Sequence, residues 1–483
     1  MDLRRLPIAT GALVLAAVLC CSGQISASAS DSVQPPGWDE PVRLADVVDY
    51  DPDPHVVEVH LEAIPAVVEL ASGVRVEAWT YNGSMPGPLI RIRVGDRLVV
   101  RFTNRLPQPT TIHWHGLRIP AQMDGVPGHS QPEVPPGGTF TYDFVVPDAG
   151  LFWYHPHVLS AAQVGFGLYG ALLVDDPDDG VAVEDEIVLV LSDISVLPDG
   201  RMEPPDSGGA TAMVFGREGN HVLVNGRERP RLVVRAGAPQ RWRVVNAAKS
   251  RYFQLFLDGQ PLVQIGGDGG LQESPAVRDR ILLAPGERAD LLVAPQATRE
   301  SELTLASPLH DRGYGSVEYR EQPDLLTFRF ADLPPVPGPL PLPAGRVISP
   351  PAVAGATKVG IDLTLGQGSD GTFEFGINGV PFAKDRPIVA ALGETQIWTV
   401  TNRTKWSHPF HLHGYSFLVL DGSGQPIRPL AWKDTVDVPR ETSVSFVVRF
   451  DDRPGMWMYH CHILDHADGG MMGMVEVRHT RKQ

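Results

Sequence analysis

GDRLVVRFTN (residues 95–104) is one of three copies of a single strand pattern; the others are GAPQRWRVVN (237–246) and GETQIWTVTN (393–402). Each copy starts with glycine, alternates apolar with polar residues and ends in asparagine, which is the pattern of a half-buried β-strand. An Asn-Gly turn precedes each copy, beginning at Asn82, Asn225 and Asn378. The repeat indicates three domains of common ancestry.

The composition of the chain points to the same all-β class. Its 483 residues include 49 glycines and 45 prolines, and no long stretch shows helical periodicity. We therefore expect three β-sandwich domains, at residues 45–176, 183–332 and 352–480. The proline-rich stretch LPPVPGPLPLPAG (333–345) should form an extended connection between the second and third domains.

Residues 1–29 have the pattern of an export signal. Two arginines precede an apolar run that is too short to span a bilayer, and an Ala-Ser-Ala cleavage site follows at 27–29. We expect an exported protein, periplasmic or secreted, that begins near Ser30 and has no transmembrane segment when mature. The sequence leaves open whether the general or the twin-arginine route is used, and whether a lipid is attached at Cys20 or Cys21.

The net charge and the cysteine content reduce the range of possible functions. A formal net charge of −16 makes the chain a poor candidate for binding nucleic acid or anionic membranes. Cys20 and Cys21 would leave with the signal, so that Cys461 remains alone and can form no intramolecular disulfide. A single thiol in an oxidising compartment is protected when it binds a metal. Cys461 is therefore a candidate metal ligand, and we expect a monomer.

Four His-x-His pairs distinguish the first and third copies from the second. Nine residues after the closing asparagine, the first copy has His113 and the third has His411, whereas the second has Leu255. Because side chains alternate along a strand, both imidazoles of a pair point the same way. Eight imidazoles suit a metal cluster between domains 1 and 3, with domain 2 as a spacer without metal. The pairs are His113/His115, His155/His157, His411/His413 and His460/His462.

The third copy carries a second set of ligand-type side chains. Two imidazoles, a thiolate and a thioether form the ligand set of a blue-copper centre, and they are supplied by His408, Cys461, His466 and Met471. The matching positions of the first copy hold Thr110, Pro156, Ala161 and Phe166. This centre is therefore predicted in domain 3 alone, back to back with the histidines that flank its cysteine.

The segments HWHG, WYHPH, HPFHLHG and HCHILDHADGGMM resemble the four copper signatures of the three-domain multicopper oxidases, in order and over essentially the whole mature chain. That family includes laccases, bilirubin oxidases, bacterial copper-efflux oxidases and ferroxidases. The resemblance implies three cupredoxin-like Greek-key domains and four copper ions per chain. It assigns the type 1 copper to His408, Cys461, His466 and Met471, and the type 2 copper to His113 and His411. The paired type 3 coppers would take His115, His155, His157, His413, His460 and His462.

The resemblance also implies a reaction. A reducing substrate would dock near an exposed edge of His466 or His408 and give single electrons to the type 1 copper. Electrons would then pass from Cys461 through the backbone to His460 and His462, and four of them would reduce one O₂ to two waters at the trinuclear cluster.

Reduction of O₂ also consumes protons, so an acid near the cluster is expected. Asp124, in the segment MDG, matches the family's position for this proton relay. Some bacterial members carry a second acid just after the last copper histidine, where this chain has Ala467. Asp468 is the neighbouring candidate for that second role.

The leading hypothesis for function is the oxidation of small organic donors such as phenols, aromatic amines or tetrapyrroles, coupled to the reduction of O₂. The alternative keeps the same copper centres and takes Cu(I) or Fe(II) as the donor, in metal detoxification. No motif defines the donor pocket, although its walls could include Trp406, Trp432 or Asp434. Four methionines surround the blue-copper strand, where core packing is favoured over the binding of cuprous ions; they are Met456, Met458, Met472 and Met474.

Overall fold

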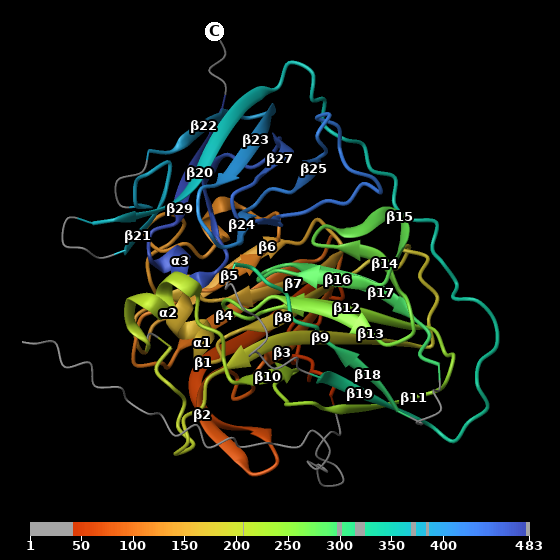
Figure 1. Ribbon diagram of the computed structural model, residues 1–483. Coiled ribbons are helices and arrows are strands. Elements are labelled where there is room, and N and C mark those ends of the chain that lie inside the picture. The colour runs from red at the N-terminus through yellow and green to blue at the C-terminus, as the bar shows by residue number, and fades with distance from the viewer. Residues whose placement is uncertain are drawn as a thin grey trace, which may run out of the picture.

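The computed structural model describes residues 42–479, apart from 206, 297–301, 314–323, 369–372 and 383–385. The predicted export signal at 1–29 lies outside these residues. Strands make up 49% of the described residues and helices 5%, and these strands form six sheets, two in each domain (Figure 1). The predicted all-β class is thus confirmed. Within the described ranges, no helix has the length and apolar character needed to cross a membrane.

Domain 1 packs a sheet of order β2-β1-β4-β6 against one of order β3-β8-β7-β5. Leu61 and Phe102 from the first sheet meet Trp114 and Phe152 from the second in one buried core. The elements are β1 (Val56–Ala71), β2 (Val74–Tyr81), β3 (Gly87–Arg93), β4 (Arg97–Asn104), β5 (His113–His115), η1 (Ala121–Met123), β6 (Thr139–Val145), β7 (Gly150–His155), α1 (Ser160–Gly165) and β8 (Gly170–Asp175).

Domain 2 pairs a sheet of order β10-β9-β12-β17-β14-β15 with one of order β11-β19-β18-β13-β16. Trp242 stacks on Phe328 across the interior, with ring centroids 4.9 Å apart. The elements are β9 (Asp185–Ile194), α2 (Gly209–Phe215), β10 (His221–Val224), β11 (Arg231–Val234), β12 (Gln240–Asn246), β13 (Phe253–Leu257), β14 (Leu262–Gly267), β15 (Gly270–Arg278), β16 (Arg280–Leu283), β17 (Arg288–Val293), β18 (Glu302–Ala306) and β19 (Asp324–Phe330).

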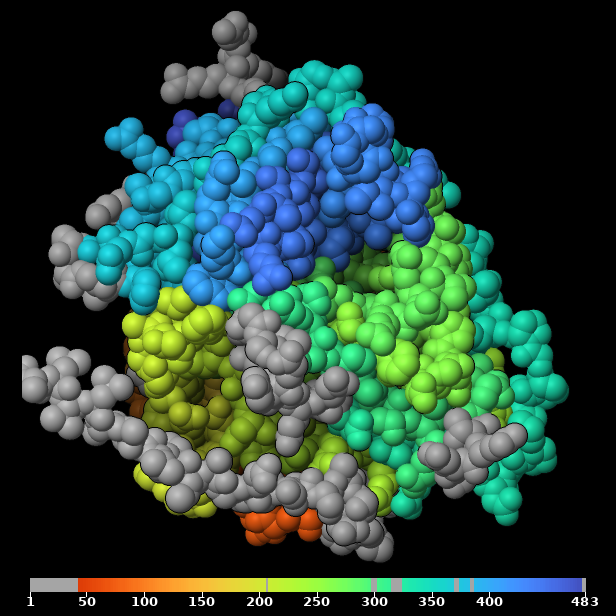
Figure 2. Space-filling view, in the orientation of Figure 1, coloured from red at the N-terminus to blue at the C-terminus, as the bar shows by residue number. Residues whose placement is uncertain are grey.

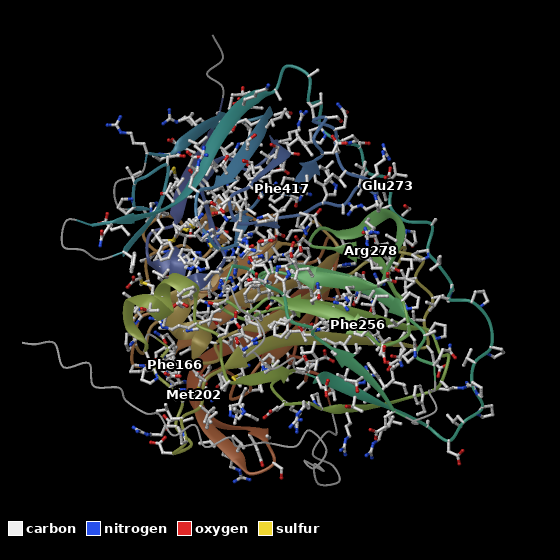
Figure 3. All side chains as sticks on the ribbon, viewed as in Figure 1. Phe166, Met202, Phe256, Glu273, Arg278 and Phe417 are labelled. Atoms are coloured by element: carbon white, nitrogen blue, oxygen red, sulfur yellow. The ribbon has the colours of Figure 1, made fainter. Side chains whose placement is uncertain are left out.

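Domain 3 pairs a sheet of order β21-β20-β23-β27-β25 with one of order β22-β29-β28-β24-β26. Its core includes Trp398, Phe410, Tyr459 and Phe417, the last of which is labelled inside this domain in Figure 3. The elements are β20 (Thr357–Gln367), β21 (Phe373–Ile377), β22 (Ile388–Ala391), β23 (Glu394–Asn402), β24 (His408–Leu412), β25 (Phe417–Leu420), β26 (Thr435–Val438), β27 (Ser443–Phe450), β28 (Gly455–Cys461), α3 (Leu464–Asp468) and β29 (Met472–Arg478).

The sequence repeat corresponds to a repeated turn and strand. The turn asparagines have φ of 54°, 51° and 53°, and the glycines after them 79°, 77° and 78°. Positive φ at both central positions is the backbone of a type I′ turn, for which Asn-Gly is the preferred pair. The repeat strands β4, β12 and β23 each pair in parallel with the first long strand of their own domain, β1, β9 and β20.

The asparagine that closes each repeat fixes the loop after it. The side-chain amide of Asn402 donates to the carbonyls of Trp406 at 2.6 Å and Val438 at 2.9 Å, and its oxygen accepts from the Thr404 amide. Asn104 and Asn246 make the corresponding three bonds in their own domains. In domains 1 and 3 this loop leads directly to the first His-x-His pair, so the repeat places the histidines.

The three domains lie against one another, and domain 3, in blue, sits across the green and yellow domain 2 in Figure 2. The proline-rich connection has no helix or strand and runs along the outer edge of the molecule in Figure 1. A partly buried contact between domains 2 and 3 includes a titratable group: the Tyr252 hydroxyl donates to Oδ1 of Asp437 at 2.8 Å. Burial raises the pKa of Asp437 to about 7.

This carboxyl gives the protein a testable pH dependence. Because Asp437 binds its proton more tightly when folded than when unfolded, stability falls as pH rises from about 4 to about 7. At about 1.4 kcal/mol per pKa unit, the cost above pH 7 reaches at most about 4 kcal/mol. Asp437→Asn still accepts from Tyr252 and should melt several degrees higher than the wild type at pH 8, by scanning calorimetry. The two proteins should melt together at pH 4, and an equal difference at both pH values would contradict this assignment.

Candidate metal centres

All eight histidines of the four predicted pairs meet at the boundary of domains 1 and 3. Their side chains are buried, at most 8% of a residue being exposed. Rings from the two domains stack: the centroids of His115 and His411 lie 3.8 Å apart, and those of His113 and His413 lie 3.9 Å apart. The structure therefore brings the eight imidazoles into one cluster.

Strand pairing explains how the imidazoles converge. In domain 1 β5 pairs with β7 so that His113 lies opposite His155. In domain 3 β24 pairs with β28 in the same way, so that His411 lies opposite His460. The residue in the middle of each triplet points to the other face of its sheet, and Trp114, Leu412 and Cys461 accordingly lie in the domain cores.

The free nitrogens of the cluster fit metal ions. Among the described residues, six buried nitrogens of these histidines have no hydrogen-bond partner: Nε2 of His113, His155 and His411, Nδ1 of His115, and both nitrogens of His462. A buried polar atom without a partner is costly, so such a group normally has a ligand. Triads with nitrogens close enough to share an ion are His113/His411/His413, His113/His115/His155 and His157/His413/His460.

Asp124 and Asp434 hold the cluster in matching ways from opposite domains. The backbone carbonyl of Asp124 accepts from Nδ1 of His113 at 2.7 Å, while its Oδ2 accepts from Nδ1 of His413 in the other domain at 2.8 Å. The carbonyl of Asp434 accepts from Nδ1 of His411 at 3.0 Å, and its Oδ1 accepts from Nε2 of His115 in domain 1 at 3.1 Å. These bonds fix which imidazole nitrogen is left for a metal.

Arg288, on β17 of domain 2, supports this arrangement although its domain has no ligand. Its guanidinium is fully buried and forms a fork with Asp434, with Nη1 2.7 Å from Oδ1 and Nη2 2.5 Å from Oδ2. Burial alone would raise the pKa of Asp434, but Arg288 holds it well below its ordinary value. The prediction that domain 2 is only a spacer is therefore incomplete, because this domain supplies the charge that neutralises Asp434.

The glycine of the HWHG segment is required by the same ion pair. Gly116 has φ of +88°, and a Cβ at this position would lie 2.3 Å from Nη2 of Arg288 and 2.7 Å from Oδ2 of Asp434. Any side chain here would push the pair apart. The glycine at this position of the HWHG segment thus has a steric cause.

The second ligand set, His408, Cys461 and His466, is assembled on the other face of β28. Nδ1 of His408 lies 3.3 Å from the Cys461 sulfur, Nδ1 of His466 lies 3.6 Å from it, and the two nitrogens are 3.0 Å apart. Met471 is completely buried in the same core, and its carbonyl accepts from the Cys461 amide at 3.1 Å. Two imidazole nitrogens and one sulfur that converge in this way fit a blue-copper centre.

Burial prepares these side chains for a metal. It lowers the pKa of His408 to about 3, so this imidazole is neutral and can act as a ligand. Burial also raises the pKa of the Cys461 thiol, and a bound metal ion would be needed to stabilise its thiolate. The amide of Ile463 donates to the sulfur at 3.4 Å.

Neither imidazole of this centre is exposed, so the expectation of an exposed edge on His466 or His408 is wrong. Nε2 of His466 donates to the carbonyl of Val214 on α2, and Phe375 stacks on its ring at 4.3 Å. Nε2 of His408 is hydrogen-bonded to Thr404 at 2.7 Å. Sequence reasoning missed this cover because α2 belongs to domain 2, about 250 residues away along the chain.

Comparison with known proteins agrees with this geometry. Family models described as multicopper oxidase match residues 65–179, 186–306 and 356–481. The multicopper oxidase MmcO of Mycobacterium tuberculosis is 32% identical to this chain over 84% of each protein. The chain belongs to the multicopper oxidases.

Solved structures of multicopper oxidases have the same fold. The enzyme from Campylobacter jejuni, described as a metallo-oxidase, superimposes with a TM-score of 0.80 at 28% identity, covering 91% of this chain and 94% of that one. The enzyme from Pseudomonas thermotolerans gives 0.74 at 34% identity, covering 88% and 99%. This oxidase accordingly binds copper and couples the oxidation of a reducing substrate to the reduction of O₂.

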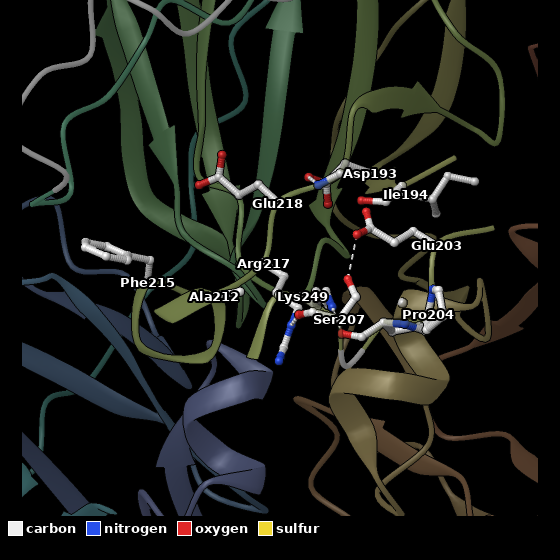
Figure 4. Close-up of a pocket in the computed structure, with 16 residues that line it drawn as sticks. Asp193, Ile194, Glu203, Pro204, Ser207, Ala212, Phe215, Arg217, Glu218 and Lys249 are labelled. Carbon is white, nitrogen blue, oxygen red and sulfur yellow. Dashed lines mark hydrogen bonds between the residues drawn. The ribbon is translucent and has the colours of Figure 1, made fainter. Parts of the chain in front are cut away.

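A cavity of about 450 Å³ opens beside the blue-copper centre of the oxidase. Phe215 and Arg217, at the end of α2 and just after it, form part of its wall, and Arg217 forms an ion pair with Asp465, the neighbour of His466. Figure 4 shows the carboxylates of the cavity lining on one side and Arg217 and Lys249 on the other. We call this space the α2 cavity; its carboxylates are Asp193, Glu203 and Glu218.

The three residues expected near the donor pocket lie in different places in the structure. Trp406 packs against Phe215 of the α2 cavity, with ring centroids 5.3 Å apart. Trp432 lines a different cavity, of about 340 Å³, and Asp434 belongs to the histidine cluster. Only Trp406 of the three therefore lies near the α2 cavity.

Asp468, expected as a second acid at the histidine cluster, forms its hydrogen bonds with another segment. Its two carboxylate oxygens accept from the backbone amides of Ser160 and Ala161, at 3.2 and 2.9 Å. These amides begin α1, the counterpart of α3 in domain 1. Within the part of the chain that the structure describes, Asp468 thus joins two domains and has no hydrogen bond to a cluster histidine.

Proposed function

We propose that this multicopper oxidase takes its electrons from small organic donors bound in the α2 cavity, in the manner of a laccase. The cavity is large enough for an aromatic ring, since its volume is about 450 Å³, and it has one aromatic wall residue, Phe215. Val214, the neighbour of the wall residue Phe215 on α2, accepts a hydrogen bond from Nε2 of His466 at 3.1 Å. This contact between α2 and the blue-copper ligand carries the proposal.

The alternative donor, Cu(I) or Fe(II), is favoured by the three carboxylates of the cavity. However, Asp193 pairs with Arg251 at 2.8 Å, and Glu218 pairs with both Arg251 and Arg312. Among the described residues, every group of three converging His, Cys, Asp or Glu side chains lies within the two histidine sites. The cavity therefore offers space for an organic molecule, and its described residues form no assembled carboxylate site for a metal ion.

We also propose that the chain holds four copper ions, with the assignment that the family signatures imply. One would be bound by His408, Cys461, His466 and Met471, one by His113 and His411, and two by the six remaining histidines of the cluster. When bound, these ions would supply one-electron redox chemistry and the binding and reduction of O₂. Their role is supported by the partnerless nitrogens of the cluster.

The protein itself connects the two copper sites and supplies protons for the reduction of O₂. Cys461 is the last residue of β28 and lies between His460 and His462 in the chain, so a continuous backbone joins the two sites. The Oδ2 atom of Asp124 accepts from Nδ1 of His413 at 2.8 Å, and its Oδ1 lies 3.3 Å from Nδ1 of His113. That oxygen is available to carry a proton to the site of O₂ reduction.

Asp124→Asn tests the proton role. Asparagine still accepts from His413 but cannot carry a proton, so kcat should fall by about 10²-fold, the lower range for general acid catalysis. Copper content and blue absorption should remain those of the wild type, because no ligand changes. Oxygen uptake measures the rate, and Asp143→Asn, an exposed partner of Arg97, is the control. An unchanged kcat would show that Asp124 is not part of the proton relay.

Filling the α2 cavity tests the donor. Ala212→Phe should lower kcat/KM for a phenol by at least about tenfold, the cost expected when a binding pocket loses its contacts, while blue absorption is unchanged. Thr211→Phe, exposed on the same helix, should have little effect. Both rates should be measured with free copper chelated, because a phenol rate that disappears on chelation would identify a metal ion as the real donor.

We further propose that the chain is exported, to the periplasm or the medium, and is a monomer. The support is the signal pattern of residues 1–29 together with the single cysteine after it. Mass spectrometry of protein purified from the producing cell should find an N-terminus near Ser30. An intact Met1 would overturn this proposal.

A further inference from the structure

The cavity of about 340 Å³ that Trp432 lines is built by all three domains. Gly116 belongs to domain 1, Gly269 to domain 2 and Trp432 to domain 3, while residues 349–351 of the chain that connects domains 2 and 3 also line it. It shares no lining residue with the α2 cavity. We call it the arginine cavity, because its lining includes Arg118, Arg346, Arg449 and Arg453.

Positive charge exceeds negative charge in the lining of the arginine cavity. Beside the four arginines, only two acidic residues line it, Asp148 and Asp451. The carboxylate of Asp148 is already occupied, since it forms a fork with Arg118 at 2.5 and 2.8 Å. Arg346 and Arg449 form no ion pair and no side-chain hydrogen bond with the described residues. In a chain with a formal net charge of −16, this cavity is a local positive region that attracts anions.

Arg453 is the buried cation of the cavity, with 9% of the residue exposed. Its Nε donates to the carbonyl of Gly414 at 3.0 Å, and its Nη1 forms an ion pair with Asp452. Its Nη2 has no hydrogen-bond partner among the described residues, and Oδ1 of Asp451 is 3.7 Å away, beyond hydrogen-bond distance. A buried donor without a partner is costly, so such a group normally has an acceptor. This nitrogen therefore points to a ligand that accepts hydrogen bonds.

A second positive charge acts on the same guanidinium. Burial in the first place, and then the neighbouring Arg118, lower the pKa of Arg453 below its ordinary value. A bound anion would oppose both effects, because a nearby negative charge favours the protonated form of an arginine.

The cavity combines this charge with apolar surface. Trp432, Pro350 and Pro351 line it together with Tyr415, whose ring centroid lies 4.8 Å from Cζ of Arg453. Guanidinium groups match carboxylates with two parallel hydrogen bonds, and they also stack on aromatic planes. The volume lies within the range of about 300–1,000 Å³ that is usual for small-molecule sites.

We propose that the arginine cavity binds a small organic anion of the aromatic carboxylate class. The guanidinium groups would hold the carboxylate, and the apolar wall around Trp432 would accept the planar body. The site is separate from the copper centres and from the α2 cavity, and it is independent of the identity of the electron donor.

Benzoate is a redox-inert probe of this class, and benzamide is its neutral counterpart of similar shape. In isothermal titration of the copper-loaded enzyme, benzoate should bind at least about tenfold more tightly than benzamide, since hydrogen bonds to a charged acceptor are the stronger ones. Inorganic phosphate has charge without an apolar body and should bind more weakly than benzoate. Arg346→Gln/Arg449→Gln should weaken benzoate binding by at least about tenfold, because two cations are removed, and should leave benzamide binding unchanged.

Arg93→Gln/Arg278→Gln is the matched control. Both arginines are exposed, neither has an ion pair among the described residues, and neither lines the arginine cavity; Arg278 is labelled in Figure 3. This variant loses the same two charges and should bind benzoate like the wild type. Copper content and blue absorption should be those of the wild type in both variants, because no copper ligand changes.

Crystals of the wild type soaked with 4-iodobenzoate locate the site without any variant. The anomalous signal of iodine should lie in the arginine cavity. Iodine found only in the α2 cavity or at the histidine cluster would overturn the proposal. So would equal benzoate affinity of the wild type and Arg346→Gln/Arg449→Gln, or phosphate binding as tight as that of benzoate. Because phenol oxidation is not measured in these experiments, failure of this proposal leaves the proposed donor unaffected.

Discussion

Replacing Cys461 with Ser should abolish both the blue absorption and turnover of this oxidase while the fold remains. Serine is similar in size, and its hydroxyl can still accept the 3.4 Å contact from the amide of Ile463. The soft thiolate that the two imidazole nitrogens face at 3.3 and 3.6 Å would be gone, and a hydroxyl is a poor substitute for it. Electrons then have no entry to the strand that bears His460 and His462.

Visible absorption, copper analysis and oxygen uptake together check this result. Copper should fall by the one ion of the blue centre, while the histidine cluster keeps its own, because Cys461 points away from it into the core of domain 3. Circular dichroism should match that of the wild type. Intense blue absorption in the serine variant would refute Cys461 as the ligand, and loss of all copper would refute the separation of the two sites.

Replacing Arg288 with Met should destabilise the protein and empty the histidine cluster while leaving the blue centre in place. Asp434 and Asp268 would remain buried without the guanidinium that forms ion pairs with both of them. Removing one partner of a buried ion pair costs about 3–5 kcal/mol, because the remaining charge has no compensation. His115 and His411 both bond to Asp434, so its displacement should disturb their orientation.

A second substitution separates charge from packing. Arg288→Met/Asp434→Asn removes both charges and should regain a large part of the lost stability, since uncharged replacements of buried pairs are often well tolerated. Thermal unfolding and the paramagnetic resonance signal of the cluster copper are the readouts. Arg403→Met, in an exposed pair with Asp362, is the control and should change neither. If the double variant is no more stable than Arg288→Met, the uncompensated charge of Asp434 is not the cause of the lost stability.

The sequence by itself determined the fold class and the histidines that meet, because both are encoded locally. The alternation in 95–104 and its two sister copies indicates β-strands, and an Asn-Gly pair between two strands favours a type I′ turn, which all three copies have. His-x-His spacing on a strand puts both imidazoles on one face whatever the rest of the chain does. For the same reason Cys461 had to face away from His460 and His462.

Only the tertiary structure decided the surroundings of these ligands, because each depends on contacts between residues hundreds of positions apart. Asp124 bonds to His413 in another domain, and Arg288 of domain 2 reaches Asp434. The cover of His466 by Val214 reversed the expectation of an open edge, and Asp468, at the end of α3, was found hydrogen-bonded to the backbone of α1. A polar side chain that must be satisfied when buried takes whichever partner the packing of domains brings near, and a local sequence pattern contains no record of that partner.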